Sequence, residues 1–283
     1  SYLKELKLSE AQKNQVVSWF HTRKEPPREA ERKELLRAEG IDFTYDGGHH
    51  ALKGVSVSIA RGEMLSIVGT NGAGKSTFSK VLCGFEKPQK GFLTMEGEDL
   101  GKYSIKERAD YIGYVMQNPN QMISKTKIFD EVALGLVNRG LPEEAVRPRV
   151  EAALRTCGLY PFRNWPVSAL SYGQKKRVTI ASILVLEPKI IFLDEPTAGQ
   201  DLYHYTQIMD FLAELNRRGT TVVLITHDMH LMLEYTPRAV VFHDGRVICD
   251  TSAAQVLNSP EIVATAHLKE TSLYHLSALC GID

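Results

Sequence analysis

Short apolar or alternating segments recur along the chain between residues 41 and 249, and they predict β-strands. Two early segments alternate between apolar and polar residues around a turn at Asp46, Gly47 and Gly48, which predicts an antiparallel pair. Two later segments are almost wholly apolar, as is typical of parallel strands that are buried on both faces. The predicted strands are residues 41–45, 55–59, 63–68, 91–95, 111–116, 189–193, 221–226, 239–243 and 246–249.

Apolar residues between positions 118 and 165 instead recur every three or four residues, which predicts helices. One set is Ile128, Val132 and Leu136, and the next is Val146, Val150, Leu154 and Cys157. We therefore expect an all-helical insertion over residues 118–165, within an α/β domain that has a mostly parallel central sheet and an antiparallel β subdomain. Further helices are predicted at residues 77–83, 173–186, 205–215 and 252–283.

The two ends of the chain depart from this α/β pattern. The first segment is densely charged, and residues 28–37 are interpreted as a charged helix with only Leu35 and Leu36 to bury. We interpret this segment as a linker, with a disordered tail as the alternative. The predicted divisions are a charged linker over residues 1–39, the α/β domain over residues 40–250 and a helical tail over residues 251–283.

The composition excludes several classes of partner and site. Lysine plus arginine equals aspartate plus glutamate, 34 each, so charge favours neither nucleic acid nor anionic lipid as the main partner. The four cysteines are far apart, which is typical of reduced thiols in an intracellular protein rather than of a disulfide framework or a zinc site. The longest apolar stretch, near residues 178–186, is about half of what a bilayer span needs. We therefore expect a cytoplasmic protein that contacts a membrane through a partner.

The most specific motif occupies residues 69–77 and fits the pattern G-x-x-x-x-G-K-[ST]. An apolar strand precedes it and a helix follows it, as the phosphate-binding form of this motif requires. The alternative is a glycine-rich turn before an ordinary helix. The loop amides would face a phosphate, Lys75 would reach the β- and γ-phosphates of ATP, and Ser76 would ligate Mg²⁺. The predicted contact residues are Gly69, Thr70, Asn71, Gly72, Ala73, Gly74, Lys75, Ser76 and Thr77.

Two acids, Asp194 and Glu195, directly follow the apolar strand at residues 189–193. Ligands of open α/β sheets bind at the carboxyl ends of the strands, so both acids are expected beside the phosphate loop. Asp194 would hold the Mg²⁺ that Ser76 also ligates, and Glu195 would polarise the attacking water. Alone, such a pair would be an ordinary solvated loop.

Leu170-Ser171-Tyr172-Gly173-Gln174 opens a predicted helix, and here the sequence resembles the ATP-binding cassette (ABC) family. The family signature is Leu-Ser-Gly-Gly-Gln, and Ser171, Gly173 and Gln174 match it, whereas Tyr172 replaces a glycine. The resemblance implies that this motif faces the γ-phosphate of ATP held by a second subunit. The alternative is an N-cap serine at an ordinary helix start. Glycine would allow a close approach to phosphate that the Tyr172 ring would crowd.

Four more positions match the family, and the resemblance implies their roles. Gln117 would contact Mg²⁺ and the attacking water, and its loop would couple to a transmembrane partner. Asp201 would lie in the loop that crosses the dimer interface. His227 would bond the γ-phosphate, and Tyr45 would stack on adenine. Each of these residues also has a structural alternative. Gln117 would be a polar residue after a strand, and Asp201 a helix N-cap. His227 would be a structural histidine at a strand end, and Tyr45 a half-buried strand tyrosine.

Finer features are similar to the energy-coupling-factor importers of vitamins and metal ions, including the cobalt-type ATPases. These features include Gln-Asn-Pro at residues 117–119 and Gly-Gln-Lys-Lys-Arg-Val at residues 173–178. The resemblance implies Mg-ATP hydrolysis, head-to-tail dimerisation with a second ABC ATPase domain, like or unlike, and binding to a transmembrane transporter subunit. The chain would then lie peripherally at the cytoplasmic face of the cell membrane. Because the chain begins at Ser1 with a charged segment, we expect the second half of a tandem ATPase. The alternatives are a non-transporter ABC ATPase and a weakly hydrolysing partner of another cassette.

Overall fold

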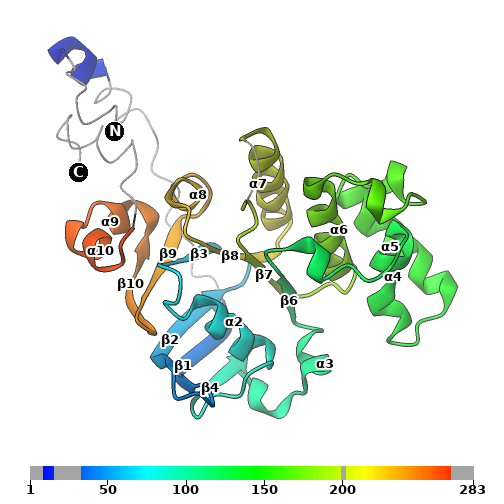
Figure 1. Cartoon of the computed structure of the whole chain (residues 1–283), viewed down its shortest axis with the longest axis horizontal. Coiled ribbons are helices and arrows are strands. Elements are labelled where there is room, and N and C mark those ends of the chain that lie inside the picture. Colours follow the sequence, from blue (N-terminus) through cyan, green and yellow to red (C-terminus); the bar gives the residue numbers. More distant parts are fainter. Residues whose placement is uncertain (1–8, 16–32, 199–201, 269–283) are drawn as a thin grey trace.

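The computed structural model describes residues 9–15, 33–198 and 202–268, and two β-sheets form its framework (Figure 1). The larger sheet has six strands in the order β10-β9-β3-β8-β7-β6. All neighbouring strands in it are parallel except β10, which pairs with β9 as an antiparallel hairpin. Its strands are β3 (Met64–Val68), β6 (Ile112–Val115), β7 (Ile190–Asp194), β8 (Thr221–Thr226), β9 (Arg238–His243) and β10 (Arg246–Ser252).

The central position of β3 and β8 explains their composition. Every residue of β3 and of β8 is buried, so neither strand has a solvent face on which alternating polar residues would be stable. The predicted mostly parallel central sheet is therefore confirmed. The order places the carboxyl ends of β3, β8, β7 and β6 side by side at one edge, where the loops that carry the predicted site begin.

The smaller sheet is antiparallel and has the order β2-β1-β4-β5. It packs against the central sheet through a shared core, in which the ring centroids of Phe78, in helix α2 (Lys75–Cys83), and Phe242 lie 5.5 Å apart. The strands are β1 (Glu34–Thr44), β2 (His50–Ala60), β4 (Lys90–Met95) and β5 (Glu98–Asp99). The predicted antiparallel β subdomain is thus confirmed.

The predicted charged helix over residues 28–37 is wrong for its described part, because β1 already begins at Glu34. Leu35 and Leu36 are 1% and 0% exposed, and Leu36 pairs with Ile59 of β2 and with Met95 of β4. Strand pairing on both sides and the burial of two leucines outweigh the local density of charge. The local sequence could not show this, because the partners are neighbouring strands. Residues 34–39 therefore belong to this sheet and not to a linker.

The helical insertion packs at the β6 edge of the central sheet, at the right of Figure 1. The apolar residues that predicted α4 and α5 are buried together in one cluster with residues of α6 and α7. The helices labelled in Figure 1 are α2 (Lys75–Cys83), α3 (Ile105–Arg108), α4 (Ile128–Val137), α5 (Glu143–Thr156), α6 (Tyr172–Leu184), α7 (Leu202–Arg217), α8 (Met229–Tyr235), α9 (Ala253–Leu257) and α10 (Pro260–Thr265). Short 3₁₀ turns are η2 (Leu100–Lys102), η3 (Pro119–Gln121), η4 (Tyr160–Phe162) and η5 (Val167–Ala169).

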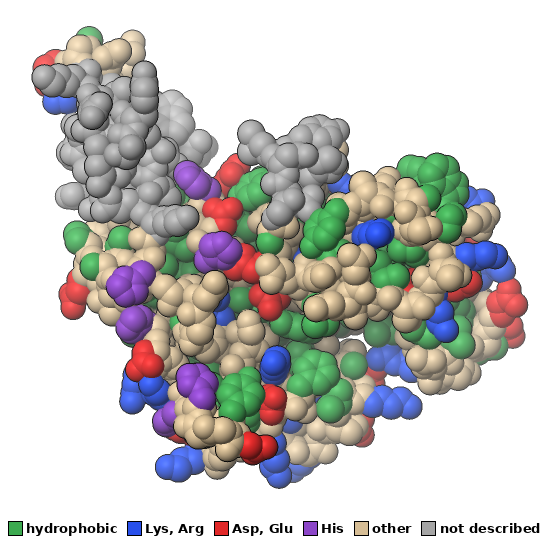
Figure 2. Space-filling view, viewed as in Figure 1, with side chains coloured by type: hydrophobic (Ala, Val, Ile, Leu, Met, Phe, Trp, Pro, Cys, Tyr) green, Lys and Arg blue, Asp and Glu red, His purple; other side chains and the backbone are tan. Residues whose placement is uncertain are grey.

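The described part of the predicted tail packs onto the sheet. Val256 and Leu257 of α9 are 0% and 3% exposed and share a core with Val68 and Met229. Residues 269–283 of that predicted tail lie outside the described residues. Among the described residues, no helix is long and apolar enough to cross a membrane. On the face in Figure 2, basic and acidic side chains are interspersed, in keeping with the balanced composition.

Candidate functional site

The glycines of the loop between β3 and α2 are required by backbone geometry. Gly69 and Gly74 have φ values of 145° and 103°, which side chains disfavour. A Cβ on Gly69 would lie 2.2 Å from the carbonyl oxygen of Phe242, and a Cβ on Gly74 would lie 2.7 Å from that of Ala51. The loop therefore folds tightly against two neighbouring strands. A cavity of about 170 Å³ lies beside it, lined by His49, Ala51, Asn71, Gly72, Gly74, Lys75, Ser76 and Thr77.

Lys75 is the first residue of α2 and is only 7% exposed. Its ammonium donates to the carbonyl oxygens of Gly69 at 2.7 Å and Thr70 at 2.9 Å. Burial lowers the pKa of Lys75, while the negative charges of Glu195 and Asp194 act in the opposite direction. A positive charge is therefore held at the cavity with neutral carbonyls as its hydrogen-bond partners. An anion in the cavity would compensate that charge.

Ser76 and Asp194 lie side by side, as the sequence predicts. The Ser76 hydroxyl donates to a carboxylate oxygen of Asp194 at 3.4 Å, although 118 residues separate them. Tyr114 of β6 donates from its hydroxyl to the same oxygen at 2.8 Å. Burial, and then the Asp194 charge, raise the pKa of Tyr114, so its hydroxyl stays protonated and continues to donate. Tyr114 was not predicted from sequence, because a tyrosine within a strand carries no local signal of this contact.

Glu195 and His227 form a second pair at the same edge of the sheet. The Glu195 carboxylate lies 2.6 Å from Nδ1 of His227 and accepts from the backbone amide of His227 at 3.1 Å. The Thr226 hydroxyl donates to its other oxygen at 3.2 Å. Glu195 has a φ of 44°, a left-handed conformation that is uncommon outside glycine and is often found at functional sites. The end of β8 therefore holds the Glu195 carboxylate in one orientation.

Tyr45 lies near the start of α2, where its hydroxyl is 3.2 Å from that of Thr77. Its ring stacks with that of His49, with centroids 6.4 Å apart. His49 lines the cavity beside the phosphate loop, and Tyr45 contacts two of its lining residues, His49 and Thr77. Asp201, which was also predicted as a site residue, lies outside the described residues.

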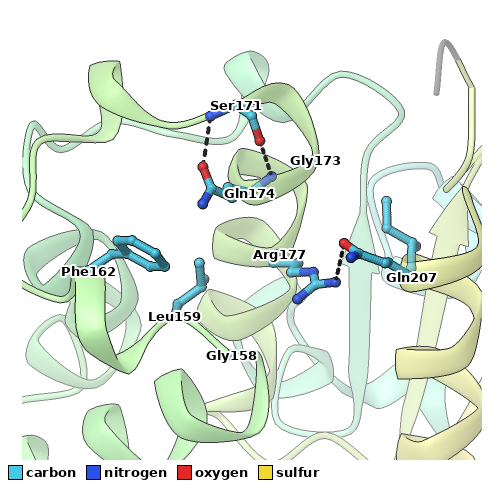
Figure 3. A pocket seen from close by; sticks show the side chains of 9 residues that line it. Gly158, Leu159, Phe162, Ser171, Gly173, Gln174, Arg177 and Gln207 are labelled. Atoms are coloured by element: carbon cyan, nitrogen blue, oxygen red, sulfur yellow. Dashed lines mark hydrogen bonds between the residues drawn. The ribbon is translucent and has the colours of Figure 1, made fainter. Parts of the chain in front are cut away.

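The signature residues line a different cavity, of about 390 Å³, at the start of α6 (Figure 3). Ser171 and Gln174 form reciprocal hydrogen bonds. The backbone amide of Gln174 donates to the Ser171 hydroxyl, and the backbone amide of Ser171 donates to the side-chain oxygen of Gln174. This reciprocal capping box explains why the helix begins here. Across the cavity, Arg177 donates to the side chain of Gln207 at 3.2 Å (Figure 3).

Within one chain, the two cavities share no lining residue. Ser171, Gly173 and Gln174 therefore do not complete the phosphate-loop cavity of their own chain. A site that used both groups would need a second copy or a second cassette.

Two side chains of α6 donate hydrogen bonds to the backbone carbonyl of Gln117. The Tyr172 hydroxyl donates to the Gln117 carbonyl at 3.3 Å, and the Lys176 ammonium donates to the same carbonyl at 2.7 Å and to that of Met116 at 2.9 Å. Lys176 is 1% exposed, and burial lowers its pKa to about 8, against the raising effect of Asp194 and Glu195. Sequence reasoning missed this role. The available signal was that Lys176 lies four residues before Ile180, on the buried side of α6.

The chain is similar to known proteins along most of its length. A family model described as ABC transporter matches residues 52–198. A putative ABC transporter ATP-binding protein of Enterococcus faecalis is 61% identical over 251 residues, which cover 88% of this chain and 44% of that protein. One of Clostridium perfringens is 56% identical over 272 residues, covering 96% of this chain and 48% of that protein. The chain thus spans about half the length of the curated relatives it matches.

Solved structures share the fold. The structure of cbiO1 from Clostridium perfringens, described as part of the ABC transporter complex cbiONQ, has a TM-score of 0.76 and 36% identity, covering 87% of this chain and 99% of that one. The ATP-binding cassette MJ0796, in a dimeric post-hydrolysis state bound to ADP and Pi, has a TM-score of 0.69 and 31% identity, covering 77% and 99%.

Proposed function

This chain belongs to the ABC transporter family, and from that premise we propose that it binds Mg-ATP and hydrolyses it to drive a membrane transporter. The observation that carries the proposal is the buried ammonium of Lys75, which lines the phosphate-loop cavity and has carbonyl oxygens as its hydrogen-bond partners. A buried charge is costly unless it is compensated, and the β- and γ-phosphates of ATP would compensate it.

The oxygen donors beside the loop fit Mg²⁺. The Ser76 hydroxyl and the Asp194 carboxylate are hard ligands 3.4 Å apart, and Mg²⁺ is held by one or two such side chains together with phosphate oxygens. The ion would neutralise charge that develops on the phosphates. Tyr114 orients Asp194 for this role by its hydrogen bond. Gln117 would contribute its side-chain oxygen from the neighbouring strand end.

Glu195 is the proposed group that polarises the attacking water, because its carboxylate is held at the same sheet edge by Thr226 and His227. His227 is 60% exposed, so its ring remains free to approach a γ-phosphate while Nδ1 stays with Glu195. Tyr45 would stack on adenine. The loop amides and side chains of residues 69–77 would hold the phosphates.

The second half of the proposed site comes from another cassette. Ser171, Gly173 and Gln174 line a cavity of their own, so they would face ATP bound by a partner domain. We propose an importer of the energy-coupling-factor type that carries a vitamin or a metal ion, supported by the similarity to cbiO1. The chain would then sit at the cytoplasmic face of the membrane, bound to a transmembrane subunit.

A weakly hydrolysing partner of another cassette is the second candidate, and Tyr172 favours it. Its side chain is 40% exposed beside the signature cavity, where the family has glycine. Hydrolysis measured on the chain itself separates the two candidates.

The test is phosphate release from Mg-ATP by the full chain and by a Glu195→Gln variant. Loss of the group that polarises the water should lower the rate about 100-fold or more, with ATP affinity retained. Glu144→Gln, an exposed change on α5, is the matched control. Hydrolysis at the parent rate by Glu195→Gln would remove Glu195 from the mechanism. Isolation of the chain from native membranes, with identification of the membrane proteins that co-purify, tests the transporter assignment.

A further inference from the structure

The start of α6 is bonded to residues 116–122, which we term the glutamine loop. Tyr172 and Lys176 lie four residues apart and therefore on one face of α6. Their side chains supply three hydrogen bonds to the carbonyls of Met116 and Gln117, at 3.3, 2.9 and 2.7 Å. Lys175 adds a longer contact of 3.4 Å to the side chain of Asn120. One helical turn thus holds the backbone on which Gln117 stands.

These hydrogen bonds lie just beyond the point where backbone pairing between β6 and β7 ends. The paired residues of β6 end at Val115, which matches Leu193 of β7. Beyond that point the carbonyls of Met116 and Gln117 receive their donors from α6 rather than from a neighbouring strand. The side chains of α6 therefore replace the β-ladder at the first two residues of the glutamine loop.

Burial makes the Lys176 contact strong. The side chain is 1% exposed, so its ammonium cannot exchange these carbonyls for water. A buried charge that is hydrogen-bonded is costly to disturb, because the alternative is a desolvated ammonium with no partner. The hydroxyl of Tyr172 is exposed and shares the Gln117 carbonyl with it, which makes Tyr172 the weaker of the two contacts.

We propose that Lys176 is a positioning residue, which together with Tyr172 joins the glutamine loop to the signature motif as one unit. This inference rests on the proposed function, since it assigns to Gln117 a place set by α6. Tyr172 then has a role that glycine could not fill, because its hydroxyl donates a hydrogen bond to the Gln117 carbonyl of its own chain. Displacement of the signature motif would move the Gln117 backbone with it, and loss of these bonds would leave Gln117 free at the site edge.

The first test needs no nucleotide. Amide hydrogen exchange of the full chain is compared for the parent, Lys176→Met, Lys176→Arg and Tyr172→Phe. Exchange over residues 116–123 should quicken about tenfold in Lys176→Met and about threefold in Tyr172→Phe, as expected for loss of a charged and of a neutral hydrogen bond. Lys176→Arg keeps the donors and should restore most of the protection.

Tyr160→Phe is the matched control, because the Tyr160 ring packs beneath Arg155 and Arg163 in the same helical insertion, far along the chain from the loop. Peptides of β3 and β8 report on the global fold. Unchanged exchange over residues 116–123 in both Lys176→Met and Tyr172→Phe would overturn the proposal. Uniform loss of protection in Lys176→Met leaves Tyr172→Phe, which keeps the ring and the core, to decide by the same measurement.

The second test uses steady-state ATP hydrolysis. Lys176→Met should lower kcat about tenfold and leave KM within about twofold, because Lys75 and Tyr45 bind ATP from other elements. A rise in KM with unchanged kcat would contradict a role through Gln117. If the parent chain neither binds nor hydrolyses Mg-ATP, the proposed function fails, while the exchange measurement still decides whether α6 holds the loop.

Discussion

The phosphate loop and the signature helix each bury one lysine, and the pair shows how similar contacts serve different ends. Lys75 is 7% exposed and Lys176 is 1% exposed. Each ammonium donates to two backbone carbonyls. Burial lowers the pKa of both, and Asp194 and Glu195 oppose that effect in both. Of the two cavities described above, one is lined by Lys75 and neither is lined by Lys176, so the Lys75 charge is the one that faces a described cavity.

The surroundings of the two lysines differ in the same way. Around Lys75 the Ser76 hydroxyl and the Asp194 carboxylate meet at 3.4 Å, a long contact that leaves both oxygens able to bind an ion. Around Lys176 the polar groups satisfy one another, as in the capping box of Ser171 and Gln174. The polar groups of the first region are thus open to a ligand, whereas those of the second region are paired with one another.

The largest expected effect is on ATP binding by Lys75→Ala. Removal of the buried charge should weaken the affinity for Mg-ATP about 100-fold or more, as expected for loss of charge-assisted bonds to two phosphates. Calorimetric titration measures the affinity, and circular dichroism checks the fold. Lys80→Ala, an exposed lysine on the same helix, is the control and should bind normally. If Lys176→Met lost affinity as severely as Lys75→Ala, the distinction between the two lysines would fail.

The next effect concerns association between chains. In a Glu195→Gln background, which should hold any ATP-bound dimer together, the chain is expected to remain monomeric or only weakly dimeric, because the Tyr172 ring crowds the approach of phosphate. Tyr172→Gly should then strengthen dimerisation about tenfold, an increment expected of relieved steric contact. Sedimentation with Mg-ATP measures the dissociation constant.

Tyr172→Phe separates the ring from the hydroxyl in that experiment. It keeps the ring and removes only the bond to Gln117, so it should dimerise as weakly as the parent. A tight homodimer of the Tyr172 chain at micromolar concentration would exclude the need for an unlike partner.

The smallest expected effect concerns the capping box of Ser171 and Gln174, in which the polar groups of the signature region are hydrogen-bonded to one another. Ser171→Ala removes the side chain that caps α6 and should lower the free energy of unfolding by about 1 kcal/mol. ATP affinity of the isolated chain should not change, because Ser171 lines the other cavity. Urea denaturation and calorimetry measure the two quantities. A large loss of ATP affinity in the isolated chain would place Ser171 at the phosphate loop of its own chain.

Local chain geometry was sufficient to predict the phosphate loop and the positions of the central strands along the chain. Gly69, Gly74 and Lys75 lie close together in the chain between a predicted strand and a predicted helix, so their spacing and this local context predict the loop. Continuous apolar runs likewise predicted β7 and β8 as central strands. The capping residue Ser171 and its partner Gln174 are also only three residues apart. The amino-acid sequence by itself therefore determined the central strands, the start of the signature helix and the motif that points to ATP.

Contacts between distant elements were decided by the tertiary structure alone. Tyr114 lies 80 residues from Asp194, and Lys176 lies 59 residues from Gln117. The start of β1 at Glu34 depends on strands that supply partners from both sides. No local period or spacing encodes such contacts, because they arise only when the core brings two separately formed surfaces together and removes them from water. Burial then turns an ordinary lysine or tyrosine into an obligatory hydrogen-bond donor.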